Sequence, residues 1–145
     1  MGLFDAVDTS VTGVDVSQTW MNAISDNIAN MNDVTSTSKG AYQPRFVVAS
    51  SVPSGQPGTG PGASAASEIG GGTQVAGIAL GSPAGTVVYD PGNPLADKNG
   101  MVRAANVDLG QQMTNMMLAE RGYQANLAII SQAEGAYQAA LGMKI

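Results

Sequence analysis

The sequence predicts a mainly α fold, in which long N- and C-terminal helices form an antiparallel, coiled-coil-like pair joined by a small β-rich and loop-rich insert. Apolar residues recur at heptad spacing near both ends of the 145-residue chain, whereas proline, glycine and short β-prone stretches gather in the middle. We therefore expect three parts: an N-terminal helix over 1–32, a β and loop region over 33–108, and a C-terminal helix over 109–145.

The N-terminal part has the pattern of an amphipathic helix. Residues 5–31 contain no proline and a single glycine, and Asp5 and Asp8 stand where carboxylates favour the positive end of a helix dipole. Asn30 and Asn32 are suited to ending the helix. The apolar positions expected to pack are Val7, Val14, Met21 and Ile28, spaced by seven residues, with Val11 between two of them and Ile24 widening the stripe.

The middle region predicts short strands separated by turns and loops. Residues 45–49, 73–80 and 86–89 are β-prone. The stretch 50–72 is rich in Gly and Pro and predicts a flexible segment. Few large apolar residues lie in this region, so it is too sparse to form a strong core of its own.

Two turn signals stand in the second half of the insert. Asp90-Pro91-Gly92 has Pro and Gly where a type II turn needs them. Asn99-Gly100 is a second turn signal. Both predict that the chain reverses direction in this part of the insert.

The C-terminal part predicts a second long helix with two heptad rows. Asp108 followed by Gln111 resembles a capping box at its start. One row holds Leu109, Met116, Tyr123, Ile130 and Tyr137, and the adjacent row holds Met113, Leu127 and Leu141. Glu120 and Glu134 share the second row, where they either fix the register or partner, or reach solvent or a pore because the seam twists.

Away from these rows, the C-terminal helix lacks the Lys and Glu of a solvated helix. Between Leu109 and Met143 the charged residues are Glu120, Arg121 and Glu134. The other positions are mostly small or amide side chains, which permit close approach and hydrogen bonding on several sides. This composition indicates a helix surrounded by other copies in an assembly; the alternative is an Ala-rich genome drifting at neutral positions.

The composition excludes several kinds of chemistry. The chain has no Cys and no His, which removes disulfides, Cys or His metal sites and Ser-His or Cys-His catalysis. The net charge of −5 argues against nucleic-acid binding. The sequence contains no run of 18 consecutive apolar residues, so we expect no membrane-spanning helix. We expect no catalytic residue, no metal and no cofactor.

Four stretches together resemble the proximal rod proteins of the bacterial flagellar basal body. The first is Ile24-Ser25-Asp26-Asn27-Ile28-Ala29-Asn30-Met31-Asn32, and the second is Tyr42-Gln43-Pro44-Arg45-Phe46-Val47-Val48. The third is Val88-Tyr89-Asp90-Pro91-Gly92-Asn93-Pro94-Leu95-Ala96-Asp97, with Asn99-Gly100 and Asn106-Val107-Asp108 after it. The fourth runs from Met117 to Gln132, where Arg121-Gly122-Tyr123-Gln124-Ala125-Asn126 is similar to the Arg-x-Tyr-Gln-x-Asn pattern of axial C-termini.

The resemblance implies terminal helices that line the inner tube of the rod and order only on assembly. It also implies export through the flagellar type III apparatus without a cleaved signal. The implied partners are other copies of the chain, other rod proteins and adjacent basal-body components, with neither nucleic acid nor membrane insertion.

The expected function is that of a structural rod subunit, which assembles helically and transmits torque from the membrane-embedded ring to the hook. A soluble two-helix export adaptor or chaperone is one alternative, although it should carry a charged outer helix face. A distal rod or hook component is the other, although such proteins are usually much longer.

Overall fold

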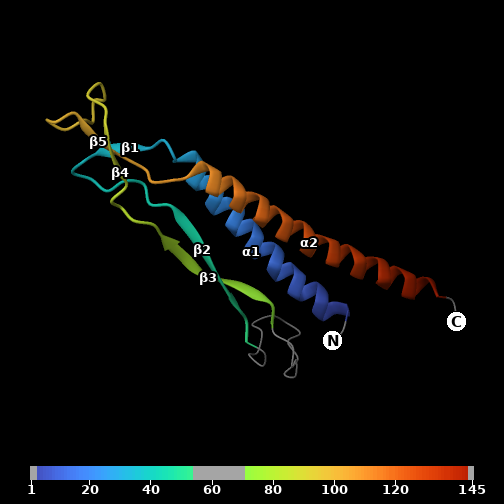
Figure 1. Ribbon diagram of the computed structural model, residues 1–145. Coiled ribbons are helices and arrows are strands. Elements are labelled where there is room, and N and C mark those ends of the chain that lie inside the picture. The colour runs from blue at the N-terminus through green and yellow to red at the C-terminus, as the bar shows by residue number, and fades with distance from the viewer. Residues whose placement is uncertain (1–2, 54–70, 144–145) are drawn as a thin grey trace. The chain divides into compact units, whose positions relative to one another are not determined.

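The computed structural model describes residues 3–53 and 71–143 (Figure 1). Two long helices, α1 (Leu3–Ala29) and α2 (Leu109–Gly142), stand at the two ends of the described chain. Between them lie the strands β1 (Val34–Ser36), β2 (Arg45–Ser51), β3 (Thr73–Leu80), β4 (Thr86–Tyr89) and β5 (Met101–Ala104). Roughly half of the described residues are helical and 21% are in strands. The two helices and the small β insert are confirmed.

The helix ends follow the local chemistry of the sequence. An Oδ1 atom of Asp108 accepts a hydrogen bond of 2.8 Å from the Gln111 amide, so Asp108 caps α2 as predicted. At the end of α1, the side-chain amide of Asn30 donates to the Asp26 carbonyl over 2.8 Å. The same carbonyl accepts the main-chain amide of Asn30 over 3.1 Å, so Asn30 binds it twice where the helix ends.

The three β-prone stretches are strands, and two further strands were missed. β1 and β5 are three and four residues long, too short to carry a periodic signal of their own. They form with β4 an antiparallel sheet of order β1-β5-β4. Val102, opposite Ser36 on one side and Val88 on the other, is 2% exposed and forms the centre of this sheet.

β2 and β3 form a separate two-stranded ribbon. The Val52 amide donates to the Gly72 carbonyl over 2.9 Å at one end, and the Gly81 amide donates to the Pro44 carbonyl over 2.7 Å at the other. These pairings make the ribbon antiparallel. Residues 54–70 of the predicted flexible segment lie outside the described residues, whereas residues 50 and 51 belong to β2.

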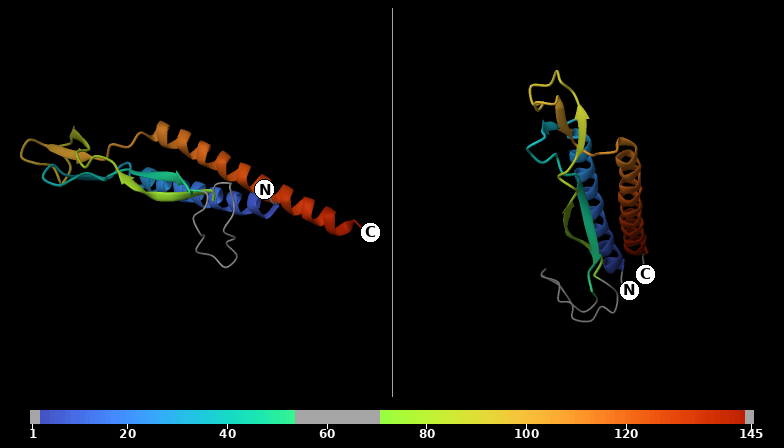
Figure 2. Two further views of the ribbon diagram at one scale, coloured as in Figure 1. Left: turned by 90° about the horizontal axis from the view of Figure 1, so that it is seen from below. Right: turned by 60° about the vertical axis from the view of Figure 1, so that its left-hand side comes forward.

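The chain divides into two compact units. The helices α1 and α2 and the strands β2 and β3 each contribute residues to both units. Unit 1 comprises Met1–Thr19, Val48–Gly77 and Leu118–Ile145, and unit 2 comprises Trp20–Val47 and Ile78–Met117. Within each unit, the segment of α1 lies between the segment of α2 and the ribbon (Figure 2). In unit 1 the Thr73 amide of the ribbon donates to the Thr12 hydroxyl of α1 over 3.1 Å.

The two units bury different kinds of side chain. The buried apolar residues of unit 2 are Ala23, Ile24, Ala41, Pro44 and Val102, and its buried polar residues are Asn27 and Gln112. In unit 1 the buried residues are Ser10, Ser17, Ala119 and Ala133, all of them small. Unit 1 therefore depends on close helix approach, because it buries no large side chain among its described residues.

Candidate assembly site

Asn27 is the centre of the polar contacts in unit 2, where it is 1% exposed. Its Nδ2 donates to the Arg45 carbonyl over 2.9 Å and to Oε1 of Gln112 over 3.1 Å. Its Oδ1 accepts from the Arg45 amide over 2.8 Å and from the Tyr42 hydroxyl over 3.1 Å. These four bonds use every donor hydrogen and both acceptor lone pairs of the amide.

The pairing of Asn27 with Arg45 imitates a β-ladder. A strand neighbour would exchange one N–H and one C=O with the main chain of Arg45, and the Asn27 amide does both. The amide therefore ties the last turns of α1 to the first residue of β2. Through Gln112 the same side chain also reaches the first turn of α2, so one residue joins three elements.

The surroundings of Asn27 are themselves polar. Arg45 and Asp26 form an ion pair of 2.6 Å, with side chains 48% and 51% exposed. An exposed pair of this kind contributes about 1 kcal/mol or less. Burial raises the pKa of the Tyr42 hydroxyl, and Asp26 acts in the same direction, while Arg45 opposes both. The hydroxyl therefore keeps its proton and remains a donor to Asn27.

In unit 1 the two helices approach closely along small residues. A Cβ atom added at Gly13 of α1 would come within 2.6 Å of Nδ2 of Asn126, and one added at Gly122 of α2 would meet the Ser17 hydroxyl at 3.3 Å. Phe4 near the start of α1 contacts Tyr137 near the end of α2. Since position numbers rise along one helix as they fall along the other, the two segments of unit 1 run antiparallel.

The contact faces of the helices differ by one position from those the heptads predict. On α2 one predicted row, with Met116, Tyr123 and Ile130, is half-buried. The second row at the contact consists of Gln112, Ala119, Asn126 and Ala133, in place of the predicted Met113, Leu127 and Leu141. Met113, Leu127 and Leu141 are exposed by 56%, 41% and 69%. On α1 the buried row is Ser10, Ser17 and Ile24, and Val11 is 43% exposed.

The physical reason for the shift is the short distance between the helices. Ser10, Gly13 and Ser17 leave no side chain long enough to hold α2 away, so small residues of α2 fill the contact. The larger apolar residues then project from the chain. The predicted heptad positions of α1 are half-buried, between the buried small residues and the exposed large ones: Val7, Val14, Met21 and Ile28.

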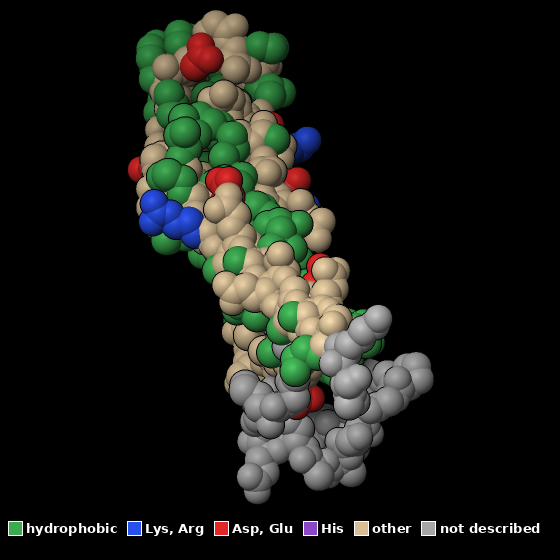
Figure 3. Space-filling model, turned by 90° about the vertical axis from the view of Figure 1, so that its right-hand side faces the viewer, with side chains coloured by type: hydrophobic (Ala, Val, Ile, Leu, Met, Phe, Trp, Pro, Cys, Tyr) green, Lys and Arg blue, Asp and Glu red, His purple; other side chains and the backbone are tan. Residues whose placement is uncertain are grey.

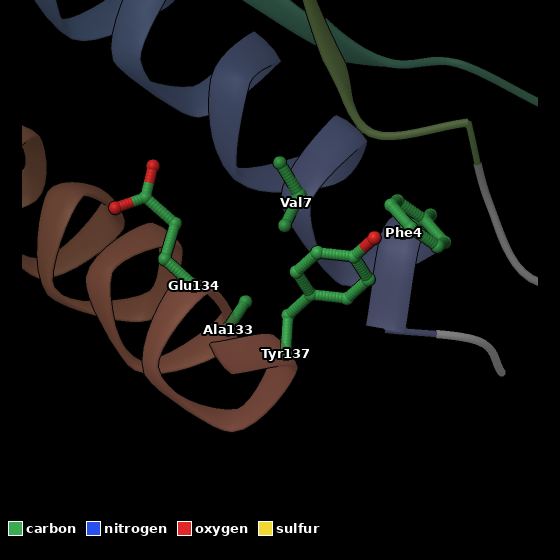
Figure 4. A pocket seen from close by; sticks show the side chains of 5 residues that line it. All are labelled: Phe4, Val7, Ala133, Glu134 and Tyr137. Atoms are coloured by element: carbon green, nitrogen blue, oxygen red, sulfur yellow. The ribbon is translucent and has the colours of Figure 1, made fainter. Parts of the chain in front are cut away.

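A shallow hollow of apolar side chains opens between the helices of unit 1 (Figure 4). Phe4, Val7, Ala133, Glu134 and Tyr137 line it. The rings of Phe4 and Tyr137 meet edge to face with their centroids 6.2 Å apart. Val7 and Tyr137 point toward one another, and the Glu134 carboxylate points away from the rings of Phe4 and Tyr137.

The predicted turn after β4 forms, with a different backbone from the one expected. The Asn93 amide donates to the Asp90 carbonyl over 3.2 Å, which closes the turn. Gly92 is not among the glycines of positive φ, so the turn is not type II, because that type needs a positive φ at this position. Pro91 and Asp90 are equally suited to a type I turn.

The second turn is organised by Asp97. Its Oδ1 accepts from the Asn99 amide over 2.8 Å and from the Met101 amide over 3.0 Å, and its Oδ2 accepts from the Thr37 hydroxyl over 3.1 Å. The backbone bonds from Met101 and Asn99 lower the pKa of this carboxyl below its usual value. Gly100 closes the turn with a φ of +73°, as the Asn-Gly signal predicts.

Arg103 holds the neighbouring loop. Its guanidinium donates to the Ala84 carbonyl and, over 3.1 Å, to the Thr37 carbonyl. Neither Arg103 nor Gln112 was singled out from the sequence. A lone Arg in a short strand and a Gln near a helix start are common surface residues, so neither gives a signal.

The remaining predicted residues lie on the surface. Leu109, Tyr89, Pro91, Gly92, Pro94, Glu120 and Arg121 are exposed. Figure 3 shows few charged side chains on one face, scattered among hydrophobic and neutral ones. Such a face is poorly suited to water and well suited to contact with protein.

The described residues hold no group of three or more metal-binding side chains. Neither described helix is both long and apolar enough to cross a membrane.

Comparison with known proteins identifies relatives across almost the whole chain. The family described as "Flagellar basal body rod FlgEFG protein C-terminal" matches residues 98–143. The flagellar basal-body rod protein FlgC of Salmonella typhimurium is 33% identical over 131 residues, 90% of each chain. FlgC of Agrobacterium fabrum is 35% identical over 125 residues, covering 83% of this chain and 80% of the relative. FlgC of Borreliella burgdorferi is 29% identical over 149 residues, covering 99% and 98%.

Proposed function

Since the chain belongs to the family of the flagellar basal-body rod protein FlgC, we infer that it is a structural subunit of the flagellar rod and not an enzyme. The observation that carries this function is the identity of 33% over 90% of both chains. The names of these relatives do not favour the export adaptor or chaperone.

We further propose that the subunit assembles helically with other copies and with other rod and basal-body proteins, and that the rod transmits torque to the hook. The support is the surface of α2, where large apolar side chains are exposed and charges are few. Removing that surface from water on assembly contributes about 25 cal/mol per Å² of apolar area. Its exposed apolar residues include Met113, Met117, Leu118, Leu127, Ile129 and Leu141.

The predicted packing residues have two roles in this proposal. Those that face the other helix, such as Tyr123, Ile130 and Asn126, hold the subunit in shape as a coiled-coil-like pair. Those that project, such as Leu127 and Leu141, contact neighbouring subunits. We propose that the helices line the inner tube of the rod and that the type III apparatus exports the chain.

A deletion strain tests the function directly. Basal bodies purified from it and viewed by negative-stain microscopy should lack the rod beyond the inner-membrane ring, and a plasmid copy of the chain should restore it. A complete rod in the deletion strain would contradict the proposed function.

A matched pair of variants tests the subunit contacts. Leu127 is exposed in the single chain, so Leu127→Asp should leave its fold intact but bury an unpaired carboxylate between subunits, at a cost of several kcal/mol. We expect an exported chain and no rod. Gln138→Ala removes one exposed amide and should have a mild effect. Swimming assays with immunoblots of medium and basal bodies distinguish the outcomes; normal swimming by Leu127→Asp would exclude this contact.

A further inference from the structure

The hollow of unit 1 has an apolar lining, and the carboxylate of the exposed Glu134 stands beside it. Phe4 and Tyr137 are 69% and 48% exposed, although both are large aromatic side chains. Glu134 is exposed beside them. A complementary ligand would therefore offer an aliphatic side chain with a cation next to it.

Arg121 is the single Lys or Arg among the described residues of unit 1, and it lies on the exposed side of α2. Arg121 forms no ion pair with the described residues, among which the ion pair is that of Arg45 with Asp26. The preceding Glu120 instead accepts a bond of 3.0 Å from Nε2 of Gln124. Leu118, one helical turn before Arg121, is 51% exposed.

Arg121 and Glu134 cannot meet within one chain. They stand 134 − 121 = 13 residues apart on one continuous helix, which separates them by about 20 Å at a rise of 1.5 Å per residue. Any pairing of the two side chains therefore joins two molecules.

We propose that Leu118 and Arg121 of one copy dock at the hollow of a second copy, with Leu118 against the exposed faces of Phe4 and Tyr137 and the guanidinium of Arg121 on the Glu134 carboxylate. This inference rests on the proposed rod function and names a contact within it. Because donor and acceptor surfaces differ, each copy can bind one neighbour at each surface. Contacts of this heterologous kind build rings or open helical filaments rather than closed pairs.

The absence of cysteine from the chain permits a clean cross-linking test. Arg121→Cys and Glu134→Cys are introduced singly and together, and purified basal bodies are treated with a short bis-maleimide. This reagent suits the site because the Cβ atoms of an Arg–Glu pair stand farther apart than a disulfide allows. The double variant should give a ladder of dimers, trimers and larger species on a denaturing immunoblot, and each single variant at most dimers.

Charge reversal provides the second measurement. Arg121→Glu and Glu134→Arg should each cause loss of swimming, and the two together should restore it. Arg121→Glu with Asp15→Arg is the matched control and should not recover, because Asp15 lies away from the hollow.

Two results would overturn the contact. One is a double cysteine variant that is present in basal bodies but gives no species larger than those of the single variants. The other, decisive if the cysteine variants fail to assemble, is a double charge reversal that swims no better than the single ones. Absence of the unmodified chain from basal bodies would instead overturn the rod function itself.

Discussion

Unit 2 is stabilised by directional bonds and unit 1 by close contact of small side chains. The three largest fully buried side chains of the described residues, Ile24, Val102 and Asn27, all lie in unit 2. There the Asn27 side chain donates to the main-chain carbonyl of Arg45 and accepts from its amide. The Asp97 carboxylate accepts from the main-chain amides of Asn99 and Met101. Unit 1 instead packs Ser10, Ser17, Ala119 and Ala133.

The difference teaches which part of the subunit is complete by itself. Hydrogen bonds that are satisfied inside unit 2 need no neighbour. Small residues between the helices of unit 1 bury little apolar area, and the large residues Phe4, Leu127 and Tyr137 are left exposed. We therefore infer that unit 1 obtains much of its stability from neighbouring subunits.

The largest effect on the single chain is expected from Asn27→Asp. The carboxylate has no hydrogen to donate to the Arg45 carbonyl or to Gln112, and the guanidinium of Arg45 is already paired with Asp26. We expect a loss of about 3 kcal/mol in the free energy of unfolding at neutral pH. Urea denaturation of the purified full-length chain, followed by circular dichroism, measures this loss.

Asn30→Asp is the matched control for that substitution, since it makes the same chemical change at an exposed position one turn away. It removes the bond to the Asp26 carbonyl and places a negative charge at the end of α1, at a cost of about 1 kcal/mol. Equal urea midpoints for the two variants would show that the contacts of Asn27 do not stabilise unit 2.

An intermediate effect is expected from Gly13→Leu in unit 1. The added side chain would collide with Asn126, which itself donates over 2.9 Å to the Gly122 carbonyl. We expect a loss of about 2 kcal/mol in the free energy of unfolding, as for other overpacked contacts, and urea denaturation of the purified chain measures it. The double variant with Asn126→Ala should recover part of it, because the obstructing amide is gone.

Gly135→Leu controls for the change of residue type. A Cβ atom at Gly135 meets nothing within 4 Å, and a helix gains up to about 1 kcal/mol when Gly is replaced by a better helix former. This variant should be as stable as the parent or more so. If Gly13→Leu is also as stable as the parent, the two helices do not approach closely at Gly13.

The smallest effect concerns the pH dependence of the turn at Asp97. Since the folded chain lowers the pKa of this carboxyl, its contribution to stability is present above the usual value of 3.8 and is lost as the pH falls through the folded value. An NMR titration of the Asp97 carboxyl should give a pKa below 3.8. A pKa at or above that value would mean that the Met101 and Asn99 amides do not bind the carboxylate.

The sequence predicted the long elements well, because their signals extend over many residues. Both helices, the Asp108 cap and the three β-prone segments could be derived from spacing and residue type. β1 and β5 could not, since three or four residues hold no period and these strands exist through pairing with each other. The backbone of the turn at Pro91 was also missed, because Pro and Gly suit two turn types there.

The helix contact could be predicted only in part, for a physical reason. Heptad analysis weights large apolar residues, so it selected Val11, Met113 and Leu127 as contact positions. The structure places Ser10, Gln112 and Asn126 at the contact, one position earlier in each case. Where two helices approach closely, small and amide residues fit the space. Large residues beside them then become surface, and the subunit contacts predicted for them remain to be tested.

The valence of the Asn27 amide also limits which residues can replace it. Asp offers no donor, Ser and Thr offer one, Leu offers neither donor nor acceptor, and Gln carries the right amide on a stem that is one methylene too long. In a saturation library, position 27 should accept Asn and reject the alternatives, whereas Tyr42 and Gln112, which each contribute one bond, should tolerate more. A lineage could therefore leave Asn at this position only by altering two or three partners in the same step.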